Sequence, residues 1–390
     1  MTATADVVII GGGIVGASVA YHLGAERFPG RVLVIDPDLT YARATTPASM
    51  GGVRTQYSVA SNLAMARYGL DFYSRFDDAL GGAWGRPRAH FHRSGYLLLA
   101  HDINEATLRE RMAAQRSIGV AVEWLGPDEI RRAVPGLVPG AAVGALWTRG
   151  DGYVSPRGAL QGLVERSREL GAGWLQDEVV GLQLEGERAT VRTRGSGSVS
   201  TAVVVLTAGA WSRDIAGLAG VELPVLALRR QSCLVQLSRP LPARLPMVLD
   251  RADSIAFRSD TETDDHVLVS RQVTGETPGF RFDWDVERFA AEIAPCLRRY
   301  LPGAGEPRLQ RGLAGHYDVS PDENPILGRH PEHPALLIAA GFSGHGLMLA
   351  PAAGRMTSDL IRNGRSEALD PRPYRLSRFA ENDPIIDPQI

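Results

Sequence analysis

The chain has 390 residues and a formal net charge of −2, with 44% hydrophobic and 22% charged residues. At roughly 150 residues per domain, this length predicts two closely packed domains, and the ordinary globular composition excludes a fibre or a disordered chain. So weak a charge, without a basic stripe, argues against nucleic acid as a partner.

Cysteine and lysine usage bear on location and chemistry. Cys233 and Cys296 lie far apart and outside CxxC spacing, so neither a disulfide framework nor a metal site is expected, and a reducing cytoplasm fits best. The apolar run from Val7 to Ile10 is too short for a signal peptide or a membrane span. All 42 basic residues are arginine, and lysine is absent.

The chain opens with a strand, a glycine turn, a helix and a second strand. The apolar run ends at Gly11, an Ala/Val-rich helical segment follows, and residues 31–36 form the next predicted strand. Strands that are apolar throughout are typical of a parallel sheet covered on both faces. The pattern therefore predicts an α/β fold with a doubly wound sheet.

Gly11, Gly13 and Gly16 stand in GxGxxG spacing at this first turn. Without side chains, the backbone can approach a pyrophosphate and the helix N–H groups can face the phosphates. Asp36 ends the second strand about 20 residues later, where its carboxylate can accept hydrogen bonds from ribose hydroxyls and repel a 2′-phosphate. The sequence therefore predicts a dinucleotide other than NADP.

The middle of the chain is less regular. Residues 45–54 are small and glycine-rich and are predicted to form an irregular loop near the ligand. Helices are predicted over 64–76, 103–118 and 158–170, and strands over 93–100 and 201–209. Residues 221–311 alternate apolar and polar positions between proline and glycine turns, which favours antiparallel strands over helix.

A second glycine loop lies near the end of the chain. An apolar strand from Leu336 runs into Gly341-Phe-Ser-Gly-His-Gly346, and a helix over 347–363 ends near Gly364. The positive end of this helix suits the N1–C2=O side of a flavin, where negative charge accumulates on reduction. Two such helix starts, one for phosphate and one for a ring, favour FAD over NAD.

These elements predict two domains that alternate along the chain. A doubly wound, Rossmann-type FAD-binding domain comprises residues 1–85, 148–220 and 312–370. An antiparallel-β-sheet substrate domain is inserted as residues 86–147 and 221–311, and residues 371–390 form a C-terminal tail.

Five segments in this order are far more specific than the first motif alone. They are Ile10-Gly-Gly-Gly-Ile-Val-Gly16, Asp151-Gly-Tyr-Val-Ser-Pro156, Ala208-Gly-Ala-Trp-Ser212, Ser320-Pro-Asp-Glu-Asn-Pro-Ile-Leu-Gly328 and Gly341-Phe-Ser-Gly-His-Gly346. Through them nearly the whole chain resembles the D-amino-acid-oxidase-like flavoprotein family, nearest its sarcosine oxidase, dimethylglycine dehydrogenase and glycine oxidase members.

The resemblance implies FAD bound in an extended form. Where relatives tether the flavin through Cys or His, this chain has Gly315 and Ala48, so a non-covalent cofactor is expected. The expected cofactor contacts are Gly11, Gly13, Ile14, Val15, Gly16, Asp36, Pro37, Thr45, Ser49, Met50, Gly51, Gly52, Val179, Ala208, Gly209, Trp211, Gly341, Gly344, His345, Gly346, Leu347 and Met348.

The resemblance also implies candidate catalytic residues. Arg54 matches an arginine beside the flavin ring, where its cation would hold a carboxylate or stabilise the reduced flavin. Tyr57, His316, Tyr317 and His345 are the other candidates, although a packing role for His345 is equally open. The implied reaction oxidises the C–N bond of a small amino acid or amine by hydride transfer to flavin N5, giving an imine, with His316 or Tyr317 as a base.

Departures from the family leave alternatives open. The lysines that activate oxygen or hold the substrate carboxylate in sarcosine oxidase-like members are absent, and Met348 stands in the second of these positions. The electron acceptor is therefore oxygen or another carrier. A 2-hydroxy acid dehydrogenase, which needs a firmer general base, and a non-catalytic flavin-binding assembly protein are the alternatives. Neither the individual substrate nor the oligomeric state follows from the sequence.

Overall fold

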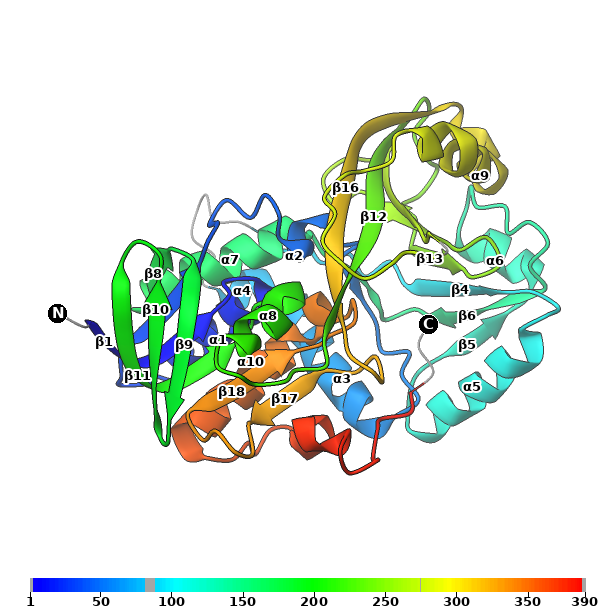
Figure 1. The fold of residues 1–390 in the computed structure, drawn as a ribbon. Helices are drawn as coiled ribbons and strands as arrows, with labels where there is room; N and C mark the ends of the chain where they lie inside the picture. The colour runs from blue at the N-terminus through cyan, green and yellow to red at the C-terminus, as the bar shows by residue number, and fades with distance from the viewer. Residues whose placement is uncertain (1–2, 81–87, 274, 388–390) are drawn as a thin grey trace.

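The computed structural model describes residues 3–80, 88–273 and 275–387, and it contains two eight-stranded sheets (Figure 1). The first sheet is mainly parallel. In spatial order its strands are β17 (Ile326–Arg329), β18 (Leu336–Ala340), β11 (Gly197–Leu206), β1 (Ala3–Ile10), β2 (Val32–Asp36) and β8 (Gly173–Gln176), with β10 (Arg188–Thr193) and β9 (Val179–Glu185) branching from β11.

The parallel strands are apolar because both faces of the sheet are covered. Val7 and Ile9 of β1 pack with Val19 and Leu23 of a helix, whereas Val8 of β1 faces the layer that β9 and β10 provide. The helices of this lobe are α1 (Ile14–Ala25), α2 (Thr45–Ala48), α3 (Ala60–Ser74), α4 (Phe76–Ala79), α7 (Pro156–Glu169), α8 (Ser212–Gly217) and α10 (Gly346–Asn363). This architecture confirms the predicted α/β class.

The second sheet belongs to the other lobe. Its strands, in spatial order, are β16 (Pro307–Val319), β12 (Leu226–Leu237), β15 (His266–Arg271), β14 (Ile255–Ser259), β13 (Met247–Asp250), β4 (Tyr96–Ala100), β6 (Gly144–Thr148) and β5 (Glu123–Leu125). All neighbours are antiparallel except β13 with β4. The helices here are α5 (Glu105–Ser117), α6 (Pro127–Ala133) and α9 (Ala294–Tyr300).

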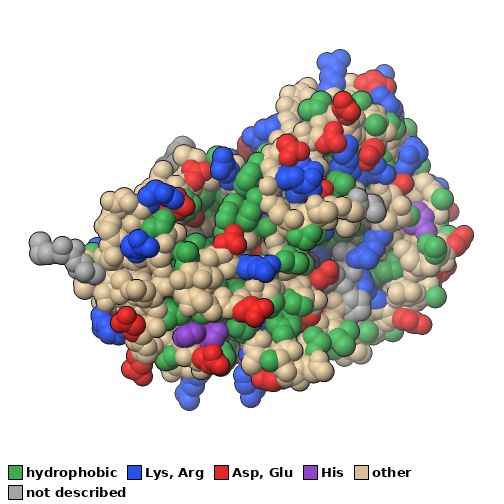
Figure 2. Space-filling model, viewed as in Figure 1, with side chains coloured by type: hydrophobic (Ala, Val, Ile, Leu, Met, Phe, Trp, Pro, Cys, Tyr) green, Lys and Arg blue, Asp and Glu red, His purple; other side chains and the backbone are tan. Residues whose placement is uncertain are grey.

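The long β12–β16 pair joins the two lobes (Figure 1). The predicted boundary at residue 312 falls inside β16, which continues to pair with β12 as far as Val319. The division into domains itself stays a prediction. Figure 2 shows hydrophobic side chains gathered where the α/β lobe meets this pair, and charges of both signs spread over the same face.

Two stretches differ from the sequence-based expectation. Residues 45–54 are not irregular: they contain α2 and the short strand β3 (Gly52–Val53), which pairs with β7 (Gly152–Tyr153). Residues 221–311 contain α9, entered through a π-helical turn, as well as strands. Both stretches are stabilised by segments distant in sequence. β3 pairs with β7, and Cys296 and Leu297 of α9 pack in the core of the second sheet.

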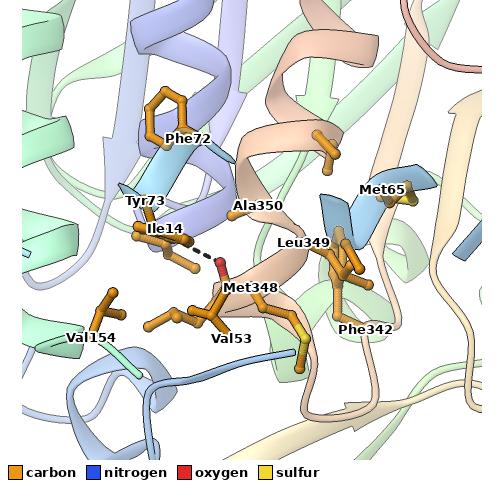
Figure 3. Close-up of a cluster of buried hydrophobic side chains, with 14 of the residues drawn as sticks. Ile14, Val53, Met65, Phe72, Tyr73, Val154, Phe342, Met348, Leu349 and Ala350 are labelled. Carbon is orange, nitrogen blue, oxygen red and sulfur yellow. Dashed lines mark hydrogen bonds between the residues drawn. The ribbon is translucent and has the colours of Figure 1, made fainter. Parts of the chain in front are cut away.

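A buried cluster fixes the start of α10 against α1 and α3 (Figure 3). Tyr73 donates a hydrogen bond to the carbonyl oxygen of Leu347 at 2.8 Å. A Cβ at Gly69 would lie 2.0 Å from the carbonyl oxygen of Met348, so only glycine lets α3 approach this closely. The cluster therefore determines where α10 begins.

The cysteines, possible membrane spans and possible metal ligands can be located within the described residues. Both cysteines are free and buried. In the part of the chain that the structure describes, no helix is long and apolar enough to cross a membrane. Nor does any group of His, Cys, Asp or Glu within those ranges have an arrangement that could hold a metal ion.

The contact between α1 and α10 predicts a strong effect of one glycine. A Cβ at Gly354 would lie 2.2 Å from the Ser18 hydroxyl, so Gly354→Val should lower the free energy of unfolding by about 1–3 kcal/mol through overpacking. Urea denaturation followed by circular dichroism measures this. Gly217→Ala, where the new Cβ meets nothing within 4 Å, is the control; equal stability of both variants would contradict this packing.

Candidate active site

The glycines of the first turn serve different purposes. A Cβ at Gly11 would lie 2.6 Å from the Thr207 carbonyl oxygen, and one at Gly16 would lie 2.0 Å from that of Gly11, so both positions need close backbone packing. Gly11 also has a φ of +101°, which favours glycine. A Cβ at Gly13 meets nothing within 4 Å. Gly13 therefore faces open space, as a cofactor cradle requires.

The start of α1 points its N–H groups at this space. Its N-cap, Gly13, supplies no side-chain cap, and the first intrahelical bond runs from the Ala17 N–H to the Gly13 carbonyl at 2.8 Å. The helix dipole places partial positive charge here, which stabilises a bound anion by about 0.3–1 kcal/mol. This end of α1 suits a phosphate.

Asp36 lies beside this helix start, as predicted. Its carboxylate accepts hydrogen bonds from the backbone N–H of Gly12 at 2.7 Å and of Asp38 at 2.9 Å. Burial raises the pKa of Asp36, while these two hydrogen bonds oppose the increase. The carboxylate is thus oriented in advance, with lone pairs left to accept from ribose hydroxyls.

One cleft joins most of the predicted cofactor residues. Those that line it are Gly11, Gly13, Ile14, Val15, Asp36, Thr45, Ser49, Ala208, Gly209, Trp211, Gly344, Gly346 and Leu347, with the catalytic candidates His316 and Tyr317. The sequence alone did not indicate the further residues that line it, namely Ala44, Thr46, Thr207, Ala210, Asp318, Ala339 and Phe342.

The other predicted cofactor residues lie outside the cleft lining. Val179 is buried in the core of the first sheet, and Pro37 is exposed. Gly16 and Gly51 shape the backbone, since a Cβ at Gly51 would lie 2.3 Å from the Val154 carbonyl oxygen. Met50, Gly52, Gly341, His345 and Met348 complete this group, and their contact with the cofactor stays a prediction.

The start of α10 also lines the cleft. Its N-cap, His345, supplies no side-chain cap, and Gly344 has a φ of +91°. A Cβ at Gly344 would lie 2.3 Å from the Tyr317 ring, so glycine lets this ring lie against the loop. Asp318 accepts a hydrogen bond from the Phe342 N–H at 3.1 Å, and burial raises its pKa to about 6.

Arg54 is a buried cation close to this second helix start. It is 2% exposed. One guanidinium nitrogen donates to the Gln56 carbonyl oxygen at 2.7 Å, and the other lies 3.1 Å from Nε2 of His345. The guanidinium also lies over the Tyr57 ring, 4.5 Å from its centroid. Among the residues described, no carboxylate forms an ion pair with Arg54, although Asp151 lies near enough to attract its charge. Neither Arg54 nor Tyr57 is among the residues that line the cleft.

His345 and Tyr57 complete this group. Burial and the adjacent Arg54 cation lower the pKa of His345 to about 3, so its neutral Nε2 accepts from Arg54 and its proton sits on Nδ1. Burial raises the pKa of Tyr57 to about 12, and its hydroxyl donates to the Met348 sulfur at 3.4 Å. Both side chains are therefore neutral around pH 7.

His316 lies in a different environment. Nε2 accepts a hydrogen bond from the Arg281 N–H at 3.0 Å, so the neutral ring carries its proton on Nδ1. Burial lowers the pKa of His316. Nδ1 is buried with no partner, although the residue lines the cleft. The Arg281 N–H thus occupies one of the two ring nitrogens, and the role of His316 as a base stays a prediction.

A buried carboxylate holds the loop that carries Arg54. Asp151 accepts from the Thr55 N–H at 2.9 Å, the Thr55 hydroxyl at 2.8 Å and the Thr148 hydroxyl at 2.6 Å. Burial raises the pKa of Asp151. Its place in the Asp151-Gly-Tyr-Val-Ser-Pro156 motif was the available signal, but only the fold shows its contact with Thr55.

The cleft fits an extended flavin nucleotide. Two uncapped helix starts line it, Gly13 leaves room for a phosphate, and Ser49 Oγ and His316 Nδ1 are buried without a partner. Gly315 and Ala48 are neighbours, since a Cβ at Gly315 would lie 3.2 Å from that of Ala48. A dinucleotide cleft between a doubly wound sheet and a β-rich lobe defines the class of flavin-dependent oxidoreductases.

The chain belongs to the DAO family of FAD-dependent oxidoreductases, whose model matches residues 6–360. FAD-dependent oxidoreductase domain-containing protein 1 from Bos taurus is 31% identical over 411 residues, covering 96% of this chain and 84% of that protein. Glycine oxidase from Bacillus licheniformis is 30% identical over 368 residues, covering 91% of this chain and 92% of that protein.

A solved structure agrees in fold. L-proline dehydrogenase from P. horikoshii superposes with a TM-score of 0.87 at 27% identity, covering 99% of this chain and 100% of that one. The resemblance inferred from the five motifs is therefore confirmed, and the protein is an FAD-dependent oxidoreductase.

The open space beside Gly13 gives a test of cofactor binding. Its extended backbone, with φ −65° and ψ −173°, suits any residue, so Gly13→Val should fold normally yet place a side chain where a phosphate would lie. We expect FAD to bind at least about ten-fold more weakly, or about 1.4 kcal/mol. Fluorescence titration of the apoprotein measures this, with Gly13→Ala as the milder case. Unchanged affinity in both would place the phosphates elsewhere.

The lowered pKa of His345 gives a test by pH. The folded pKa of His345, about 3, lies below the unfolded value of about 6.5. The contribution of neutral His345 to the free energy of unfolding is therefore fully present above pH 6.5 and decreases as the pH falls below that value. In His345→Gln this decrease should be smaller than in wild type, by up to about 1.4 kcal/mol per pH unit. Denaturation between pH 7 and 4.5 measures it. The exposed control His90→Gln should behave as wild type; a similar response of both variants would disprove the shift.

Proposed function

We propose that this enzyme oxidises the C–N bond of a small amino acid, or of a secondary or tertiary amine bearing a carboxylate, to an imine. The observation that carries the proposal is Arg54, a buried cation without a carboxylate partner among the described residues. A charge-assisted hydrogen bond to a substrate carboxylate would contribute on the order of 1.5–3 kcal/mol.

Arg54 is placed to orient the substrate. Its neighbour His345 lies between Gly344 and Gly346, which line the cleft, so a carboxylate on Arg54 lies next to the start of α10. Holding the carbon beside nitrogen in one place is the main contribution that this reaction needs from the protein. FAD, which we propose to be held here without a covalent link, would supply N5 as the hydride acceptor.

Neither side chain in contact with the Arg54 guanidinium, His345 or Tyr57, is a firm base, which favours an amine over a 2-hydroxy acid. His345 has a pKa of about 3 and Tyr57 one of about 12, so neither readily accepts a proton at pH 7. An unprotonated amine can expel the hydride with its own lone pair, whereas an alcohol must also lose its O–H proton to a base. Burial raises the pKa of Tyr317, which likewise disfavours its predicted role as base.

The named relatives support an amino-acid substrate. Glycine oxidase from Bacillus licheniformis and L-proline dehydrogenase from P. horikoshii act, by their names, on amino acids. We further propose a cytoplasmic location, which the two unpaired cysteines support. Reoxidation of the substrate-reduced enzyme in air, compared with artificial carriers, distinguishes oxygen from another electron acceptor.

The proposal predicts what Arg54→Gln should do. FAD absorbance should be retained, while KM for the reactive amino acid should rise about 10–100-fold, the loss expected from a bond of on the order of 1.5–3 kcal/mol. Anaerobic bleaching of the flavin by a panel of amino acids, N-methylated amino acids and 2-hydroxy acids identifies the substrate and measures this change.

The matched control is Arg194→Gln, an exposed arginine paired with Glu178. It should leave KM unchanged. Bleaching by 2-hydroxy acids alone would refute amine oxidation in favour of the alternative dehydrogenase. Bleaching by no compound at all would favour a flavin-binding protein without turnover.

A further inference from the structure

The tail is anchored to the cofactor lobe by a buried ion pair. Arg378 donates to both carboxylate oxygens of Asp322, each at 2.8 Å, and the two side chains are 0% and 5% exposed. Asp322 also accepts from the Ile385 N–H at 3.0 Å. Asp322 belongs to the Ser320-Pro-Asp-Glu-Asn-Pro segment, for which the proposed function has no use. The segment thus binds the tail.

Beyond this anchor the tail reaches the start of α3. In Figure 1 the tail, drawn in red, passes beside α3 towards β5 and β6. The Asp387 carboxylate, 6% exposed, accepts from the Ser58 N–H at 3.0 Å and from Asn62 Nδ2 at 2.8 Å. Asn62 in turn accepts from the Tyr374 hydroxyl at 2.9 Å. In this contact Asp387 only accepts, Ser58 and Tyr374 donate, and Asn62 does both.

The contact places negative charge beside the start of α3. The N-cap of α3, Val59, offers no side-chain acceptor, and Asp387 bonds the backbone just before it, at Ser58, and the side chain of Asn62 in the first turn. Ser58 directly follows Tyr57, whose ring lies under the Arg54 guanidinium. At the other end of the segment, Asp151 holds Thr55. Residues 54–58 are therefore fixed between two carboxylates.

We propose that Asp387 is a positioning residue for the substrate carboxylate site. By holding the Ser58 N–H and the Asn62 amide, it keeps Arg54 and Tyr57 oriented for substrate, so that a segment remote in sequence forms part of the active site's support. This inference rests on the proposed function of Arg54. It assigns to the tail a role in substrate affinity rather than in the oxidation step.

The hydrogen-bond roles make Asp387→Asn an informative variant. Asp387 faces two donors, and an amide has one acceptor, so either orientation of the new side chain sets its NH₂ group against a donor. We expect KM for the amino acid to rise about ten-fold with kcat within three-fold of wild type. The Kd of sodium acetate, measured by its perturbation of the flavin spectrum, should rise equally.

A double variant separates positioning from a general loss of stability. In Asp387→Asn combined with Asn62→Asp, the new amide donates to the new carboxylate and its oxygen accepts from Ser58, whereas the bond from Asn62 Nδ2 to Asn324 Oδ1 is lost. KM and the acetate Kd should therefore return part of the way towards wild type. Asp383→Asn, an exposed tail carboxylate paired with Arg375, is the control and should change neither value. Like Asp387 it is a carboxylate of the tail, but its ion pair is with Arg375 of the tail itself.

Hydrogen exchange of residues 54–59 tests the inference without any substrate. We expect faster exchange in Asp387→Asn than in wild type and in Asp383→Asn. Unchanged exchange and unchanged acetate Kd in Asp387→Asn would overturn the inference, as would a double variant no better than the single one. If the wild-type flavin is reduced by no amine, the proposed function fails, while the exchange measurement still decides whether Asp387 orders residues 54–58.

Discussion

The meeting of two helix starts at one edge of a parallel sheet is the constraint on which this structure depends. β1 and β18 both run parallel to β11, so the turns that follow them, at Gly11 and Gly341, emerge at the same edge. Neither α1 nor α10 has a side-chain cap. Their N–H groups therefore need acceptors from outside the chain, and a single elongated anionic cofactor can satisfy both.

The same need for an outside partner recurs at Arg54. A buried guanidinium is costly unless its charge and its donors are satisfied. Here Gln56, Tyr57 and His345 engage the guanidinium without neutralising its charge. The unfavourable charge is tolerated because Asp151 and the packing around α10 stabilise the surrounding loop. Cofactor and substrate sites are thus both places where the protein leaves polar groups incompletely satisfied.

The sequence revealed the parts of the site whose pattern is local. The glycine turn, Asp36 and the start of α10 are each defined by a few neighbouring residues, and all were predicted close to where they lie. The helices α2 and α9, the cleft residue Asp318 and the contact of Asp151 with Thr55 depend on segments far apart in the chain. The place of His316 just before the Ser320-Pro-Asp turn predicts a site role, but only the fold shows that the Arg281 N–H occupies one ring nitrogen.

The β12–β16 pair limits how the molecule can move. β16 has 13 residues, about 43 Å at ~3.3 Å per residue, and it carries His316 in the cleft while pairing with β12 along its whole length. The ladder has a register shift between Leu234 and Val235 of β12, and the paired residues on both sides of this shift resist hinge rotation of one lobe against the other. Entry and exit of small molecules are therefore left to rearrangement of loops, and a rate limited by opening would reflect loop motion rather than domain motion.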